Sequence, residues 1–440
     1  MIVLQPSWIW TSRGLQTDWC VSLEDGRIVG LNPPTRHCQV DQKLPGRLMV
    51  PGFVNAHSHA FQRALRGFVQ RTDGGADFWS WRKQMTTVAS ALTPEAVEAV
   101  SQLAFLEMIE AGFTHVGEFH YLHHQPDGTP YADPDELARR VIAAAQGVGL
   151  TITLLRVAYE RNMPGEPLSS VQLRFGDKSP LDALAAVERL NSLSENGVTV
   201  GLAPHSVRTV SKSWLEALSG FEGVLHSHVS EQPMENELCQ QEYGCSPLQL
   251  LHDAGLVDER FCAVHFTHPM QGDRDLLKQQ GARVCVCPST ELDLGDGFLP
   301  VAERKELALC VGSDSQALID PFVEIRSLEN HGRALAGQRH VLGAGLAGQL
   351  LKAGTLNGSA ALGASVQGIE IGAPADLACV DLRRPAAFEV PPVEAAVFSA
   401  NADWVSEVWV AGKQVIVDGR HPGREAICSA AQQALHGLLS

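Results

Sequence analysis

The chain has 440 residues, 45% of them hydrophobic, so it is long enough to bury one large core or two unequal ones. Its formal charge of −16, from 50 acidic and 34 basic residues, argues against nucleic acid or an anionic membrane as a main partner. The longest apolar stretches fall well short of the ~20 residues of a membrane span, and residues 1–10 lack the pattern of a secretory signal. We therefore expect a cytoplasmic protein.

Short apolar runs alternate with helical patterns through the middle of the chain. A helix is predicted to begin after Thr93 as N-cap, with Pro94 as its first residue, and to stop at Gly112. Further helices are predicted near 134–147, 181–195, 211–219, 246–254 and 271–280. The strand-like runs are the one ending at His57 and then Phe113–Phe119, Thr151–Ala158, Val198–Ala203, Gly223–His228, Phe261–His265, Ala282–Cys287 and Leu307–Gly312. Eight apolar strands alternating with helices predict an α/β fold, a parallel TIM-like (β/α)8 barrel.

The two ends of the chain have a different pattern, with short alternating segments and turns. We expect residues 1–48 and 368–440 to meet in one small β-sandwich domain beside a barrel domain of residues 49–367. Within 408–417, a hairpin centred on Gly412 and Lys413 is predicted. Residues 322–363 are expected to be helical, and the last 15 residues to form a helix.

Histidine and aspartate residues stand at the ends of several predicted strands. His57 and His59 end the first strand, and a spacing of two on an extended chain places both imidazoles on one side. His228 ends the fifth strand, His265 the sixth and Asp314 the eighth. A single histidine is more often a structural residue than a ligand, but five such groups at strand ends are hard to assign to chance. Because the carboxyl ends of barrel strands meet at one rim, the pattern predicts a metal site there.

Cysteine ligands were considered as an alternative. Cys285 and Cys287 lie in an apolar strand-like run, and no Cys-x-x-Cys pair occurs in the sequence. We interpret both as buried core residues.

The motifs Pro-Gly-Phe-Val-Asn-Ala-His-x-His, His-x-His-x-x-Glu, Val-His and Gly-Ser-Asp resemble those of the amidohydrolase superfamily over nearly the whole chain. The resemblance implies one metal ion per chain, Zn²⁺ with iron or manganese as possible occupants. Its implied ligands are His57, His59, His228 and Asp314. His226, two residues before the third ligand, is expected to be structural.

Longer stretches are similar to one family within that superfamily, the formimidoylglutamate deiminases. They are 57–67, 119–121, 203–208 and 289–297. The chain departs from this family at Gln316, where histidine is expected, and at Leu292-Asp293, where Ala-Asn is more usual. Neither departure affects an implied ligand.

This closer resemblance implies hydrolysis of N-formimino-L-glutamate to N-formyl-L-glutamate and ammonia, in histidine degradation. Metal-bound hydroxide would attack the formimino carbon. Asp314 would accept the proton of the attacking water, Glu231 would pass a proton to the departing nitrogen, and His265 would stabilise the developing charge.

The implied substrate is a small dicarboxylate, for which planar guanidinium groups are suitable partners. By resemblance, His205 and Gln62 contact the formimino end, while Arg82, Arg208 and Tyr121 receive the carboxylates. A homodimer is a further expectation from the family.

Two other functions were weighed. A deaminase of a ring substrate, such as a guanine, adenosine-type or triazine compound, would use the same metal chemistry in a more aromatic and less cationic pocket. Arg82 and Arg208 discriminate against it. A catalytically dead barrel acting as a binding protein is disfavoured by the intact set of strand-end residues.

Overall fold

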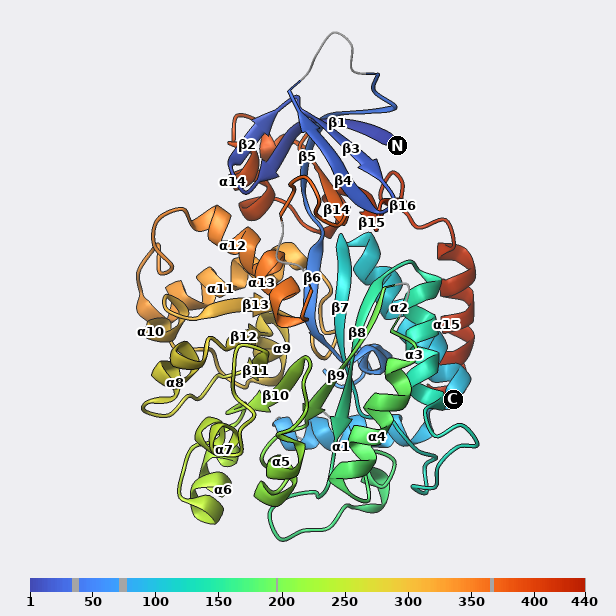
Figure 1. The fold of residues 1–440 in the computed structure, drawn as a ribbon, viewed down its shortest axis with the longest axis vertical. Coiled ribbons are helices and arrows are strands. Elements are labelled where there is room, and N and C mark those ends of the chain that lie inside the picture. Colours follow the sequence, from blue (N-terminus) through green and yellow to red (C-terminus); the bar gives the residue numbers. More distant parts are fainter. Residues whose placement is uncertain (34–38, 71–76, 195–196, 365–367, 440) are drawn as a thin grey trace.

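The computed structural model describes residues 1–33, 39–70, 77–194, 197–364 and 368–439, and shows a parallel barrel with a separate sheet at one end (Figure 1). Both parts of the predicted fold class are thereby confirmed. Across the described residues, no helix combines the length and the apolarity that crossing a membrane requires.

The barrel has eight strands, each parallel to its neighbour and in chain order. They agree closely with the predicted runs, because strands buried on both faces are continuous apolar segments. The strands are β6 Phe53–Ser58, β7 Phe113–His120, β8 Thr151–Ala158, β9 Val198–Pro204, β10 Leu225–Val229, β11 Phe261–His265, β12 Arg283–Val286 and β13 Ala308–Val311.

The barrel closes where the end of its first strand meets the residues after its last. The amide of His59 donates to the carbonyl of Asp314, and the amide of Asp314 donates to the carbonyl of His57, both at 3.0 Å. We call these contacts, between residues 57–59 and 312–316, the seam. Gly312 allows this approach, since a Cβ there would lie 2.6 Å from the carbonyl oxygen of His57.

Helices surround the barrel and cover its outer face (Figure 1). The helix predicted after Thr93 is α2, and the Thr93 hydroxyl accepts from the amide of Ala96 at 3.2 Å, which confirms the cap. The helices are α2 Pro94–Glu110, α3 Glu136–Gly147, α4 Pro180–Asn191, α5 Lys212–Leu218, α6 Pro233–Tyr243, α7 Pro247–Asp253, α8 Asp273–Gln280, α9 Pro288–Leu294, α10 Val301–Arg304, α11 Pro321–Ala336, α12 Leu346–Gly354 and α13 Leu356–Ala361.

Two elements after β6 cover the end of the barrel away from the terminal sheet (Figure 1). They are the 3-10 helix η1, Ala60–Leu65, and α1, Phe78–Ala91. The carboxylate of Asp77 accepts from the amide of Ser80 at 2.8 Å, and Ser80 completes a capping box. No local pattern in the sequence predicted α1 as a helix.

The second sheet draws strands from both ends of the chain and has the order β16-β15-β14-β5-β1-β3-β4, with β2 paired to β1. The β1 and β5 strands are parallel, and the other pairs are antiparallel. The strands are β1 Ile2–Thr11, β2 Gly14–Thr17, β3 Cys20–Glu24, β4 Arg27–Asn32, β5 Gln42–Pro51, β14 Leu377–Asp381, β15 Val405–Val410 and β16 Lys413–Ile416.

The chain passes between the two sheets at Gly52, directly after β5, so the expected boundary at 48/49 falls inside that strand. A Cβ at Gly52 would lie 2.1 Å from the Thr114 hydroxyl, which explains why glycine is needed there.

The hairpin between β15 and β16 turns one residue earlier than predicted. Its central residues are Ala411 and Gly412, with φ of 45° and 73°, and Val410 pairs with Lys413. Positive φ at both positions is the geometry of a two-residue hairpin turn. The prediction placed Lys413 in the turn because it used the glycine alone.

The helix α14, Pro392–Phe398, lies between β14 and β15, and α15, Arg424–Leu439, is the last described element, which confirms the predicted terminal helix. The α15 helix lies along α2 on the side of the barrel (Figure 1), where Arg424 forms an ion pair with Glu110.

Candidate metal centre and active site

Four side chains meet at the rim where the barrel strands end. His57 comes from β6, His59 directly follows that strand, His228 comes from β10, and Asp314 from the seam after β13. The Nε2 atom of His57 lies 3.2 Å from that of His59 and 3.1 Å from that of His228. The Oδ1 atom of Asp314 lies 3.3 Å from His57 Nε2 and 3.2 Å from His59 Nε2. One ligand atom from each residue fits within 4.8 Å of all the others.

The hydrogen bonds of these side chains favour a cation between them. His59 donates from Nδ1 to the carbonyl of Phe119, and His228 from Nδ1 to the carbonyl of His205, both at 3.0 Å. Carbonyl oxygens only accept, so each neutral ring presents an Nε2 lone pair to the centre. Those lone pairs and the Asp314 carboxylate would repel one another without a positive charge. The residues present therefore fit a metal ion held by three imidazoles and one carboxylate.

Burial favours neutral rings at two of these histidines. It lowers the pKa of His57 to about 3 and that of His228 well below its usual value. Neutral imidazoles and an ionised carboxylate are the forms that bind metals.

His265 and Glu231 lie beside this group, as expected for residues at the same rim. The Nε2 atom of His265 is 3.8 Å from Asp314 Oδ2 and 3.7 Å from Glu231 Oε1, and its Nδ1 is 3.5 Å from Glu291. Burial opposes a charge on His265, but Glu231, Cys287 and Glu291 together raise its pKa well above the usual value. A protonated His265 presents a hydrogen-bond donor towards the centre.

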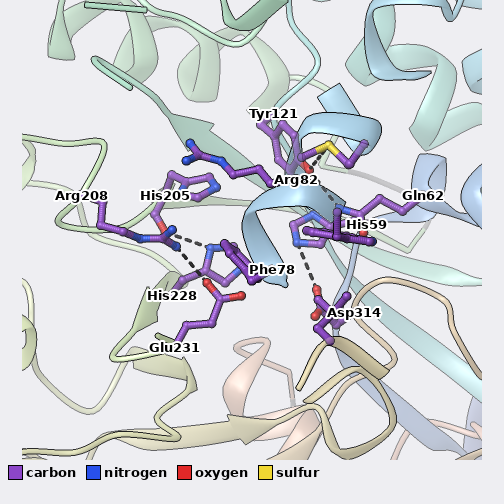
Figure 2. Close-up of a pocket in the computed structure, with 13 residues that line it drawn as sticks. His59, Gln62, Phe78, Arg82, Tyr121, His205, Arg208, His228, Glu231 and Asp314 are labelled. Atoms are coloured by element: carbon purple, nitrogen blue, oxygen red, sulfur yellow. Dashed lines mark hydrogen bonds and ion pairs between the residues drawn. The ribbon is translucent and has the colours of Figure 1, made fainter. Parts of the chain in front are cut away.

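A cavity of about 410 Å³, including its opening to solvent, lies over the centre. Figure 2 shows Arg208 and Glu231 on one side of it and His59 with Asp314 on the other. His57 belongs to the group of candidate ligands and His265 lies beside that group, but neither side chain lines the cavity. The other predicted site residues line it: His59, Gln62, Arg82, Tyr121, His205, Arg208, His228, Glu231 and Asp314.

The residues expected to bind substrate already contact one another. Gln62 donates to the Tyr121 hydroxyl at 3.0 Å, and Arg82 donates to the Tyr159 hydroxyl at 2.9 Å. Burial, and then the nearby charges of Arg208 and Arg82, lower the pKa of His205 well below its usual value. His205 is therefore a neutral ring.

Sequence reasoning missed residues that line this cavity or lie beside its charged groups. Phe78 lines it from α1, and Glu235 reaches the Arg208 side chain from α6. Burial and nearby carboxylates raise the pKa of Asp296, beyond α9, to about 9. Asp296 lies within the family-like segment 289–297, and Phe78 lies shortly before Arg82. No pattern marked Glu235, because α6 shows no apolar face that would place it inside.

Gln316, where the related family is expected to carry histidine, belongs to a buried hydrogen-bond network at the seam. Its Nε2 donates to the Ser58 hydroxyl and to the Asp314 carbonyl, both at 2.9 Å, and its Oε1 accepts from the Ser313 hydroxyl at 2.8 Å. The Ser58 hydroxyl donates onward to Glu118 at 2.6 Å. This network joins the two segments that carry three of the four candidate ligands.

Cys285 and Cys287 are both fully buried, as expected. The sulfur of Cys287 lies within 4.8 Å of ligand atoms of His265 and Asp314.

The comparisons with known proteins agree with this arrangement. Residues 48–415 match the model of the amidohydrolase family, and the chain belongs to that family. It is 36% identical to formimidoylglutamate deiminase of Pseudomonas aeruginosa over 432 residues, which is 94% of each chain. It is also similar to the crystal structure of an amidohydrolase from Brucella melitensis, with a TM-score of 0.93, 33% identity and full coverage of both chains.

A more distant structure shares the fold at 24% identity and a TM-score of 0.83, covering 99% of this chain and 98% of its own. It is an adenosine deaminase from Xanthomonas campestris with bound zinc. Membership of the amidohydrolase family confirms that the protein is a hydrolase acting on a carbon–nitrogen bond.

Proposed function

We propose that this protein hydrolyses N-formimino-L-glutamate to N-formyl-L-glutamate and ammonia, a step of histidine degradation. The observation that carries the proposal is the pairing, in one cavity, of a buried His₃Asp centre with two arginines, Arg82 and Arg208. The relative from Pseudomonas aeruginosa, named for the same reaction, supports it.

Zinc is the proposed metal ion. Three imidazoles and one carboxylate are donors that Zn²⁺ accepts, and the similar Xanthomonas campestris structure holds zinc. When bound in such a site, zinc lowers the pKa of a coordinated water towards about 7 and so supplies a nucleophile at neutral pH.

The surrounding side chains have the positions needed for proton transfer. Asp314 Oδ2 lies on the His265 side of the centre and accepts a proton from the attacking water. Glu231, whose Oε1 faces His265, carries a proton to the departing nitrogen. His265 donates a hydrogen bond to the charge that develops at the tetrahedral carbon.

The other end of the cavity suits a dicarboxylate with a formimino group. Neutral His205 accepts a hydrogen bond from the formimino N–H. Burial raises the pKa of Tyr121 well above its usual value, so its phenol remains a donor. Arg82 forms no ion pair with a carboxylate in the described part of the chain and is available to a carboxylate of the substrate.

The test is ammonia release from N-formimino-L-glutamate by native protein and by Arg82→Met and Arg208→Met. We expect kcat/KM to fall by about 30-fold to several thousand-fold in each variant, equivalent to roughly 2–5 kcal/mol for an unpaired buried carboxylate. Metal content should not change. Arg274→Met, a half-exposed arginine on α8, is the matched control and should retain native activity.

Turnover of N-formimino-glycine, which lacks the side-chain carboxylate, should fall less than turnover of N-formimino-L-glutamate in at least one of the two variants. Deamination of a ring substrate is the alternative, because the structurally similar protein from Xanthomonas campestris is an adenosine deaminase. Unchanged activity of both arginine variants on N-formimino-L-glutamate, with turnover of adenosine or guanine compounds, would replace our proposal with that alternative.

A further inference from the structure

Arg208 is a buried cation that already holds two carboxylates. Its side chain is 2% exposed, and one terminal nitrogen donates to Glu231 Oε2 at 2.8 Å. Its Nε lies 3.3 Å from Glu235 Oε2. The rings of Phe78 and Trp79 cover the guanidinium, at 5.7 Å and 5.9 Å from its Cζ. Figure 2 shows the Arg208 and Glu231 side chains pointing towards each other.

A substrate carboxylate on Arg208 would be the third carboxylate around one guanidinium. The excess negative charge would be buried among aromatic rings, where an uncompensated charge costs several kcal/mol. Above pH 7, where Glu235 is ionised, one of the three must therefore leave. A substrate carboxylate on Arg82 would not compete with a resident carboxylate, because the Arg82 guanidinium donates to the Tyr159 hydroxyl.

The two resident carboxylates are not equally free to move. Glu235 is completely buried on α6, and its other oxygen accepts from the amide of Ser230 at 3.3 Å. Glu231 lines the cavity, and its other oxygen already faces His265 at 3.7 Å. Displacement from Arg208 would therefore turn Glu231 towards His265 and the candidate metal centre.

We propose that Arg208 holds Glu231 until a substrate carboxylate takes its place, so that the group that marks the correct substrate also releases the catalytic side chain. This inference rests on the roles proposed above for Arg208 and Glu231. It makes Arg208 and Glu235 determinants of specificity: an amidine without a carboxylate enters the cavity but leaves Glu231 held.

The main test separates the carboxylate from the reacting group. N-Methylformamidine supplies the amidine, and glutarate supplies the carbon chain and both carboxylates of glutamate without its nitrogen. With zinc-loaded native protein, we expect glutarate to accelerate ammonia release from N-methylformamidine about tenfold. Without glutarate, Arg208→Met should release ammonia from N-methylformamidine faster than native protein does. Adding glutarate should not change the rate of this variant. Arg82→Met should still respond, but at higher glutarate concentrations.

A crystal structure of the native protein with glutarate gives a second readout that needs no turnover. The inference predicts a glutarate carboxylate on Arg208, with Glu231 Oε2 no longer within hydrogen-bond distance of it. Glutarate bound elsewhere, or bound on Arg208 with the Glu231 contact intact, overturns the inference. So does native N-methylformamidine turnover that glutarate only inhibits.

Glu235→Gln gives a third readout, which general damage would not produce. The amide removes one of the competing charges, so the substrate carboxylate binds without displacing Glu231. We expect both KM and kcat for N-formimino-L-glutamate to fall at least threefold. The assay is run at pH 8.5, because burial raises the pKa of Glu235 to about 7 and the native side chain must be ionised. An increased or unchanged KM contradicts the inference.

The outcomes also distinguish this inference from the proposed function. Activation by glutarate with no ammonia from N-formimino-L-glutamate would keep the release of Glu231 and remove the substrate assignment. Turnover of N-formimino-L-glutamate, together with a glutarate complex in which Glu231 still contacts Arg208, would keep the substrate assignment and remove the proposed release of Glu231.

Discussion

Glu231 contacts both parts of the active site, with one oxygen on Arg208 and the other facing His265. Its position between Arg208, proposed to bind the substrate, and His265 beside the candidate metal centre suits the proton carrier proposed above. Neither contact is visible in the sequence, where Glu231 is defined only by its spacing from His228.

At the residue scale, Glu231→Gln should leave metal binding intact and reduce turnover. The amide keeps the shape of the side chain but cannot carry the proton, so kcat should fall by roughly 10²–10⁴-fold. Metal content by elemental analysis and ammonia release by a coupled assay measure the two effects separately. Glu216→Gln, an exposed glutamate on α5, should behave as native protein. Near-native turnover of Glu231→Gln would assign the proton transfer to another group.

At the element scale, the seam fixes the position of the Asp314 segment relative to His57 and His59. Asp314 and His265 have φ of 46° and 70°, conformations that non-glycine residues rarely adopt. Backbone strain of this kind persists where the surrounding structure fixes it, and it clusters at active sites. Here the backbone hydrogen bonds of the seam and the side chain of Gln316 hold the Asp314 segment against β6.

Gln316→Ala should weaken both the fold and metal binding. It leaves the buried hydroxyls of Ser58 and Ser313 with one partner fewer, at a cost of about 1–3 kcal/mol in the free energy of unfolding. Urea denaturation measures this cost, and chelator competition should show a raised dissociation constant for zinc. Gln240→Ala, an exposed glutamine on α6, serves as the control. If stability falls while zinc affinity is unchanged, the network does not position the ligands.

At the scale of the whole molecule, a bound metal would join β6, β10 and the segment after β13, which are far apart in the sequence. Ligands that bind only the folded state stabilise it by mass action, by about 4 kcal/mol at a free concentration 1,000 times the dissociation constant. Restoring zinc to chelated native protein should therefore raise Tm by several degrees.

His57→Ala should abolish that rise, because His57 Nε2 lies within 3.3 Å of a ligand atom of each of the other three candidate ligands. Differential scanning calorimetry with and without zinc gives the measurement, and His252→Ala, a histidine on α7 away from the site, should keep the native response. An equal rise in His57→Ala would place the stabilising metal elsewhere.

The sequence by itself determined the barrel strands, the α2 cap and the candidate ligands at the strand ends. These are local signals: a strand buried on both faces is a continuous apolar run, and a polar residue at its end belongs to the rim. The turn at Ala411 was displaced by one residue in the prediction because alanine carries no turn signal of its own.

The tertiary structure alone decided the contacts that neither the strand pattern nor the fold class implies. Three such contacts join residues that are distant in the sequence. They are the packing of α15 on α2, the seam that places Asp314 against His57, and the two carboxylates around Arg208. Arg208 in the sequence is an unpaired charge available to a substrate; in the folded protein it is already neutralised. Such contacts depend on how whole elements pack, and no local pattern of residues encodes that packing.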